Sequence, residues 1–215
     1  MNIISSILQD LLNILFGFTG DIGISIVVIT LLVKLLLIPL TVKQKFSIIK
    51  QQDMAEELEE IKEKYKSNTK ELEKQMKIHA SKNMKSMLGC FAILLQMPIL
   101  FALYNTFLNL PRNFSSLIVP WISNLSMSDD LYIIPCIYSL TMLAPSLINY
   151  IPYFRNTSKV VFNKQMAVMT TIISFVLTAR TPVAIGIYFI TSSFYSFIED
   201  ICFRIYLKSK NKLSI

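Results

Sequence analysis

A single cation, Lys34, interrupts an otherwise charge-free apolar run that covers residues 22–42. A lysine at the centre of a membrane-spanning helix costs roughly 2.5–3.5 kcal/mol on insertion scales. Snorkelling is the ordinary explanation, because the aliphatic stem can carry the ammonium toward the headgroups. Val42, however, lies eight residues further on, which is about 12 Å along a helix and more than the stem comfortably spans. We therefore predict a water-filled pocket around Lys34 that opens to the cytoplasm.

A counter-ion for Lys34 is missing from the other apolar runs, which contain no acidic residue. Glu199 and Asp200 follow the last run and are distant candidates. A buried cation without a fixed partner can take a transient one, such as an acidic segment of a passing polypeptide or an anionic lipid headgroup. Polar residues of other runs are candidates to complete the pocket, although each alone is more often a contact between helices: Gln96, Ser139, Ser146, Thr191 and Ser192.

No set of residues points to catalysis or metal binding as clearly as Lys34 points to a polar pocket. The single histidine, His79, lies in a charged segment, and we expect it at the surface. The three cysteines, Cys90, Cys136 and Cys202, fall in or at the ends of apolar runs and form no C-x-x-C pair. Such cysteines indicate packing rather than a disulfide framework or a zinc site. We expect no enzymatic activity, no metal and no cofactor.

The composition is that of a membrane protein. Of 215 residues, 53% are hydrophobic and 16% charged, whereas soluble domains have about 25% charged residues. Mean hydropathy is +0.52. The net charge of +7 arises from segments between apolar runs, so we expect no nucleic-acid partner.

Five apolar runs predict an all-α membrane protein with a bundle of five transmembrane helices. The runs cover residues 22–42, 87–110, 131–154, 165–179 and 181–198. About 20 apolar residues are needed to cross the hydrocarbon core, and the first three runs meet that length. The fourth covers only about 22 Å, so the bilayer thins there or the helix extends past its flanking charges.

Lysine and arginine fix the orientation. With the N-terminus outside, 18 of the 21 basic residues fall in cytoplasmic segments, and Arg112 and Arg180 alone fall outside. Such a bias is a strong positive-inside pattern. We therefore predict an external N-terminus and a cytoplasmic C-terminus.

The segment 43–86 holds 11 lysines and 8 acidic residues without Gly or Pro. Apolar residues recur at helical spacing on both sides of a turn at Ser67-Asn68-Thr69. This pattern predicts a cytoplasmic hairpin of two antiparallel helices, and we favour recruitment of a partner over mere connection as its role. Residues 1–20 predict a short helix on the outer interface, the alternative being an extension of the first span. They contain no Lys or Arg, so we expect no cleaved signal peptide.

The complete division has ten segments. It consists of an external helix (1–20), first span (21–42), cytoplasmic hairpin (43–86), second span (87–110), external loop (111–130), third span (131–154), cytoplasmic loop (155–164), fourth span (165–180), fifth span (181–203) and basic tail (204–215).

Four stretches resemble the YidC-type membrane protein insertases, over about residues 18 to 207. Residues 89–104 read GCFAILLQMPILFALY and are similar to the family's second core helix. Residues 31–41 read LLVKLLLIPLT and resemble its first. Pro120-Trp121-Ile122 with Leu125-Ser126 resembles the external loop, and residues 182–193, PVAIGIYFITSS, resemble the last helix.

The resemblance implies five helices around a hydrophilic groove that opens to cytoplasm and lipid but is closed to the outside. A positive residue in the groove, here Lys34, attracts short acidic or polar tails of substrates while their apolar spans slide into lipid. No nucleotide is hydrolysed, and the membrane potential assists acidic tails. The implied groove residues are Lys34, Gln96, Ser139, Ser146, Phe189, Thr191 and Ser192.

The same resemblance implies the location and the partners. We expect a monomer in the bacterial plasma membrane that contacts nascent membrane proteins and phospholipid, with the SecYEG translocon and the ribosome as candidate partners. Lys34 and Phe189 stand where the family usually has Arg and Trp, and Ser193 where it has Asn, which indicates a divergent paralogue. A small transporter or channel with an anion site at Lys34 is the alternative, although no inverted repeat supports it.

Overall fold

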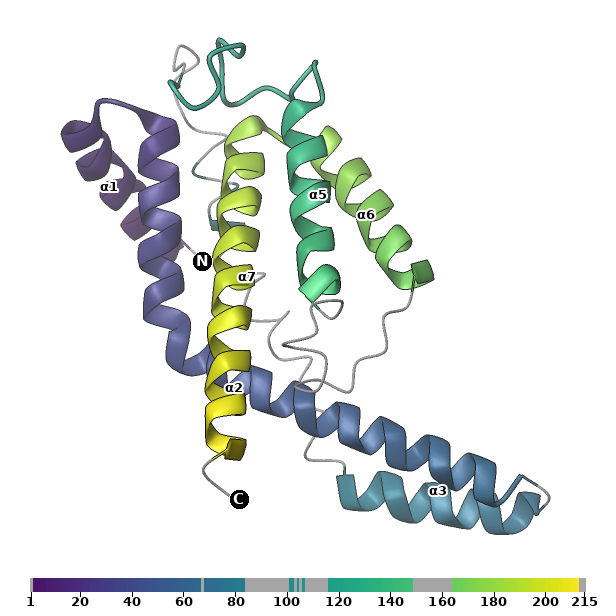
Figure 1. Ribbon diagram of the computed structural model, residues 1–215. Helices are drawn as coiled ribbons and strands as arrows, with labels where there is room; N and C mark the ends of the chain where they lie inside the picture. The colour runs from purple at the N-terminus through teal and green to yellow at the C-terminus, as the bar shows by residue number, and fades with distance from the viewer. Residues whose placement is uncertain are drawn as a thin grey trace.

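Six helices and no strand make up the described part of the chain (Figure 1). The computed structural model describes residues 2–66, 68–83, 101–102, 104, 106, 116–148 and 164–212. Its helices are α1 (Asn2–Thr19), α2 (Ile22–Lys64), α3 (Thr69–Asn83), α5 (Ile133–Leu147), α6 (Lys164–Ala179) and α7 (Val183–Lys212). The predicted all-α class is therefore confirmed. Most of the predicted second span, including Gln96, lies outside the described residues.

Among the described helices, α2 is long and apolar enough to cross a membrane. Shorter apolar helices cover Ser6–Thr19, Ile133–Pro145 and Ala167–Ala179. The predicted first span covers about the first half of α2, the fourth nearly coincides with α6, and the fifth overlaps the first part of α7, which begins at Val183. The third begins as α5, whose last helical residue is Leu147, and residues 149–154 lie outside the described part. The count of five spans therefore stays a prediction.

Helix α2 changes direction along its length, and its second half leaves the bundle with α3 at its side (Figure 1). Pro39 lies inside the helix. A proline removes one intrahelical hydrogen bond and its ring clashes with the preceding turn, so we attribute the bend to it. At the far end a turn that includes Tyr65 and Asn68 leads into α3. His79 was expected at the surface, but its side chain is only 12% exposed and lies 3.2 Å from the Glu57 carboxylate, because α3 packs it against α2.

Helix α1 is separate from α2 and is not an extension of it. The chain turns at Gly20, whose φ of +67° is a conformation that glycine adopts without steric cost. Leu8 and Leu12 of α1 are buried in the core that α2 contributes to, whereas Ile14 and Phe18 are exposed. Figure 1 shows α1 beside the first half of α2.

The buried core is concentrated at one end of the bundle, which we call the loop end. The turn 19–21, the segment 116–132 and the turn 180–182 lie there, and the hairpin of α2 and α3 leaves at the opposite, hairpin end (Figure 1). Residues 183–188 of α7 are all buried, whereas most of α7 beyond them is not. In α2, burial is nearly continuous over residues 21–30 and ceases at 31–40. The described helices are therefore tightly packed at the loop end and less buried toward the hairpin end.

The segment 116–132 closes the loop end by binding the starts of three helices. It donates hydrogen bonds to Asp21, the N-cap of α2, and it accepts from the first N–H groups of α5 and α7, which have no partner within their own helix. The Asp21 carboxylate accepts hydrogen bonds from the N–H of Ile24 (2.9 Å), the Ser116 hydroxyl (2.7 Å) and the N–H of Leu117 (2.6 Å). A Cβ on Gly23 would overlap the Ser116 hydroxyl, so this close approach requires glycine.

The other two helix starts are fixed in the same way. Asp129 is 2% exposed, and its carboxylate accepts from the N–H of Ile134 in α5 (2.7 Å) and from the Trp121 indole (3.3 Å). The first two N–H groups of α7, at Val183 and Ala184, donate to carbonyls of the loop at 2.9 and 3.0 Å.

Candidate functional site

Lys34 lies on α2 just beyond the buried part of that helix, and it is partly exposed. On the same face of α2 and seven residues further on, Thr41 contacts the Glu199 carboxylate of α7. No described carboxylate lies within ion-pair distance of Lys34. The structure thus places Glu199 about two helical turns from Lys34 along α2 without pairing the two.

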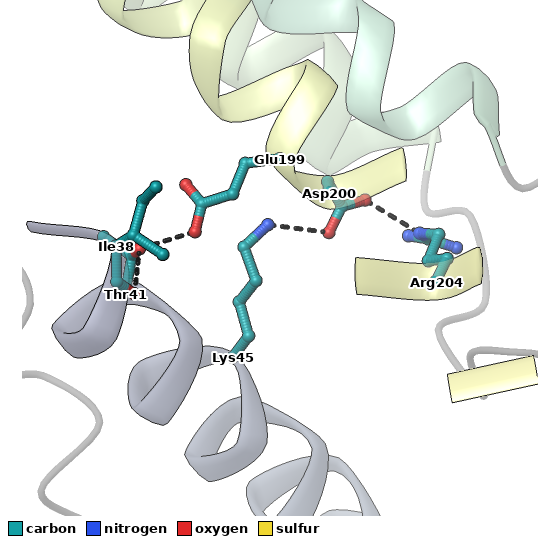
Figure 2. Close-up of polar contacts among 6 residues, drawn as sticks. All are labelled: Ile38, Thr41, Lys45, Glu199, Asp200 and Arg204. Carbon is teal, nitrogen blue, oxygen red and sulfur yellow. Dashed lines mark hydrogen bonds and ion pairs between the residues drawn. The ribbon is translucent and has the colours of Figure 1, made fainter. Parts of the chain in front are cut away.

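The two carboxylates of α7 that face α2, Glu199 and Asp200, are engaged by other groups (Figure 2). Glu199 Oε1 accepts a hydrogen bond from the Thr41 hydroxyl at 2.5 Å. Asp200 pairs with Lys45 Nζ at 3.2 Å and with Arg204 Nε at 2.7 Å. These contacts join α2 to α7 at the hairpin end. An edge-to-face contact between the rings of Phe46 and Phe203, whose centroids lie 5.0 Å apart, adds to them.

Helical spacing explains why these residues meet. Residues four, seven and eleven positions apart return to one face of a helix, so Lys34, Ile38, Thr41 and Lys45 form a stripe on α2. The matching residues of α7, Glu199 and Asp200, are consecutive and form one hydrogen bond or ion pair each with that stripe. The stripe begins with the free ammonium of Lys34 and ends with the paired ammonium of Lys45.

The other predicted groove residues make mostly local contacts. Ser139 donates to the Cys136 carbonyl at 2.8 Å, and Thr191 donates to the Ile187 carbonyl at 2.8 Å. Phe189 stacks on Tyr138 of α5 with ring centroids 5.1 Å apart, and Ser192 is partly buried. The position of Gln96 and the side chain of Ser146 lie outside the described residues. A groove shared by all seven residues therefore stays a prediction.

Ser193 is a polar residue at the open end of the α7 core that sequence reasoning did not select as a site residue. It is 6% exposed, and its hydroxyl has no hydrogen-bond partner among the described residues. A buried hydroxyl without a partner costs free energy. Ser193 therefore marks a place on α7 where a polar ligand or water would gain a hydrogen bond.

Two cavities flank α7. One of about 310 Å³ lies between α5 and α7 and is lined by Ile137, Leu140, Thr141, Ala144, Phe194 and Phe197. The other, of about 420 Å³, lies between α2 and α7 and is lined by Ile38, Val42, Tyr195, Ile198, Glu199, Cys202, Phe203 and Tyr206. The first is a wholly uncharged cleft, whereas the second has one carboxylate on its wall.

Comparison with known proteins identifies this arrangement. Residues 14–210 match the family described as 60Kd inner membrane protein. The membrane protein insertase YidC of Fusobacterium nucleatum is 32% identical over 203 residues, which are 93% of this chain and 94% of that protein. The chain belongs to the YidC family. Its members are bacterial inner-membrane proteins, and so is this chain.

Other YidC proteins include one matched over nearly its whole length and one that is much longer than this chain. The YidC of Caldanaerobacter subterraneus is 26% identical, with 94% of this chain and 95% of that protein covered. The YidC of Aquifex aeolicus is 31% identical, but the match covers 38% of it. A crystal structure of an active YidC insertase with its first transmembrane domain resolved shares the fold, with a TM-score of 0.68, 22% identity, and coverage of 93% of this chain and 45% of that one.

Three residues of the YidC arrangement were missed by sequence reasoning. Asp21 and Asp129 were not selected because a carboxylate next to an apolar run gives no sign of burial. The signal for Asp21 was available, since Thr-Gly-Asp before an apolar run is typical of a helix N-terminus. Thr41 had no comparable signal, because its partner Glu199 is 158 positions away.

Proposed function

We propose that this chain is a membrane protein insertase that moves short hydrophilic tails of client proteins across the inner membrane and releases their apolar spans into lipid. Lys34 attracts an acidic or polar tail into the open half of the bundle. The apolar span of the client then passes along the protein into the bilayer. The tail crosses the remaining outer half of the membrane together with that span, beside the closed loop end.

The observation that carries this proposal is the contrast along the bundle axis. The loop end is closed by Asp21, Asp129 and the core, whereas Lys34 lies where burial ceases and has no ion-pair partner among the described residues. An acidic residue at the membrane centre costs roughly 2.5–3.5 kcal/mol. A hydrated cation at half depth lowers that cost for the client and shortens the apolar path that its tail must cross.

The uncharged cleft between α5 and α7 supports a route for the client span. Leu140 and Phe194 in its wall are 65% and 59% exposed. In lipid, helices associate through packing of side chains rather than through the hydrophobic effect, so an apolar client helix binds such a cleft weakly and leaves it readily. The work is done by transfer of the client span to lipid, and we propose that the protein performs no covalent chemistry.

The charge distribution supports the proposed orientation. The loop end carries Arg180 among the described residues, whereas the lysines of α2 and α3 and the basic end of α7 gather at the hairpin end. By the positive-inside rule, the hairpin end faces the cytoplasm and the N-terminus lies outside. Nascent membrane proteins are the proposed clients, and the SecYEG translocon and the ribosome the proposed partners on that side.

Site-specific photocrosslinking tests the client route. We expect a photoreactive residue in place of Leu140, on the cleft, to crosslink a stalled nascent client. The matched control is Ile173, which is exposed to 59% on α6 and outside the cleft. Equal crosslinking at both positions would show that the cleft has no special role. Solute flux through reconstituted liposomes without client insertion would instead favour a transporter.

A further inference from the structure

We propose that Glu199 is a built-in competitor of the client tail for Lys34, and that Thr41 holds Glu199 so that Lys34 stays available. Thr41 is then a positioning residue and Glu199 a residue that sets how strongly acidic tails are bound and how readily they are released. This inference rests on the proposed function, because it assumes that Lys34 attracts the client tail.

The first observation is that Lys34 and Glu199 carry opposite charges but do not form an ion pair. Glu199 is the carboxylate that contacts Thr41, on the same face of α2 as Lys34 and seven residues further on, yet no ion pair joins Glu199 to Lys34 within the described residues. Opposite charges at membrane depth have a strong tendency to pair, since the alternative is solvation in a poor medium. A separate contact must therefore hold Glu199 in its present place.

The Thr41 hydroxyl is that contact. Its oxygen lies 2.5 Å from Glu199 Oε1 and 3.0 Å from the Ile38 carbonyl oxygen (Figure 2). A hydroxyl has one proton to donate. The ionised carboxylate is the stronger acceptor, and a charge-assisted bond is roughly twice as strong as a neutral one. The proton therefore goes to Glu199, and the short distance agrees with that assignment.

Asp200 cannot take the same role, because two cations already neutralise it. Lys45 lies 3.2 Å away and Arg204 2.7 Å away. The Lys45 ammonium also lies 5.8 Å from the centre of the Phe203 ring, which fixes it further. Lys45 is thus held by Asp200 and Phe203, and Thr41 is the α2 residue that contacts Glu199.

Glu199 has space in which to turn toward Lys34. Its side chain lines the cavity of about 420 Å³ between α2 and α7, so it can change rotamer without displacing packed atoms. Lys34 precedes Thr41 by about 10.5 Å along α2, so the two long side chains must extend toward each other to pair, and the bond from Thr41 to Glu199 must break first.

In this arrangement, the position of Glu199 sets how much of the positive charge of Lys34 is compensated. While Thr41 holds Glu199, the ammonium of Lys34 is only partly compensated and attracts an acidic tail. When a tail is bound, Glu199 competes with it for the ammonium and so favours its release. Without such a competitor, an acidic tail would stay bound to Lys34 for longer.

Insertion of two matched clients tests this inference in the full chain reconstituted into liposomes. The clients differ only in whether their short tail is acidic or neutral, and the measured quantity is the ratio of acidic-tail to neutral-tail insertion. Thr41→Val keeps the side-chain shape but removes the hydroxyl, so Glu199 is free to pair with Lys34. We expect the ratio to fall about fivefold, which corresponds to roughly 1 kcal/mol. Thr41→Ser keeps the hydroxyl and should keep the ratio.

Glu199→Gln decides whether Thr41 acts through Glu199. In the double variant Thr41→Val with Glu199→Gln, we expect the ratio to return at least to that of the unmodified chain. A ratio that stays low in the double variant, or that does not change in Thr41→Val, would overturn the inference. Lys34→Ala separates the two proposals: if it leaves the ratio unchanged, the role of Lys34 in the proposed function fails, whereas an effect of Lys34→Ala without one of Thr41→Val refutes the competitor alone.

Discussion

Replacing Lys34 with alanine should reduce insertion of single-span clients that have acidic tails by about ten- to a hundredfold. The reason is the loss of a charge-assisted contact, which contributes roughly 1.5–3 kcal/mol, or one to two powers of ten in an equilibrium. Insertion is measured by protease protection of the tail in liposomes that contain the purified variant. Clients with neutral tails should be affected much less.

Lys34→Arg is the matched control, because it keeps the charge and restores the residue usual in the YidC family. We expect it to retain insertion of acidic-tail clients. A stable Lys34→Ala protein that inserts both kinds of client normally would contradict the role given to the cation. The same would follow if Lys34→Arg failed as completely as Lys34→Ala.

Removal of the Asp21 carboxylate should produce the largest loss of stability. In Asp21→Ala, the N–H of Ile24, the N–H of Leu117 and the Ser116 hydroxyl all lose their acceptor. A buried group left unsatisfied costs about 1–3 kcal/mol. The Ser116 contact is buried and the other two are partly buried, so we expect a total loss of roughly 2–4 kcal/mol. The midpoint of thermal unfolding in detergent should fall accordingly.

Asp10→Ala is the control for that experiment, since Asp10 is an exposed carboxylate on α1. It should leave the unfolding midpoint unchanged. An Asp21→Ala protein as stable as Asp10→Ala would show that the segment 116–132 does not depend on Asp21 for its place at the loop end.

The helical class and the family followed from the sequence because they rest on long-range features of composition and on local motifs. Apolar runs without charge have one stable form in lipid, the helix, and the stretch around residues 89–104 has few alternatives among known families. The turn between α1 and α2 was harder to predict. Residues 1–16 have a helical pattern whether they continue the first span or fold back, and Gly20 decides between the two only through its backbone conformation.

The sequence singles out Lys34 as a candidate site residue, but it does not predict the contacts around it. Lys34 is conspicuous because a charge in an apolar run is costly. Thr41 is not, because threonines inside membrane helices usually bond to their own backbone, as Thr191 does. Ser139 was predicted as a groove residue from its polarity, yet its hydroxyl donates to its own helix. Pairs such as Thr41 with Glu199 depend on how two distant helices pack, which residue spacing along one chain does not specify.

The hydration of position 34 is the most direct test of the account. In a variant without Cys90, Cys136 and Cys202, a cysteine in place of Lys34 should react with a membrane-impermeant thiol reagent applied from the cytoplasmic side. A cysteine in place of Ile26, which is 0% exposed at the loop end, should stay unreactive. If position 34 is as unreactive as position 26, or reacts solely from outside, this ammonium lies in dry protein or faces the wrong side and cannot guide a client tail.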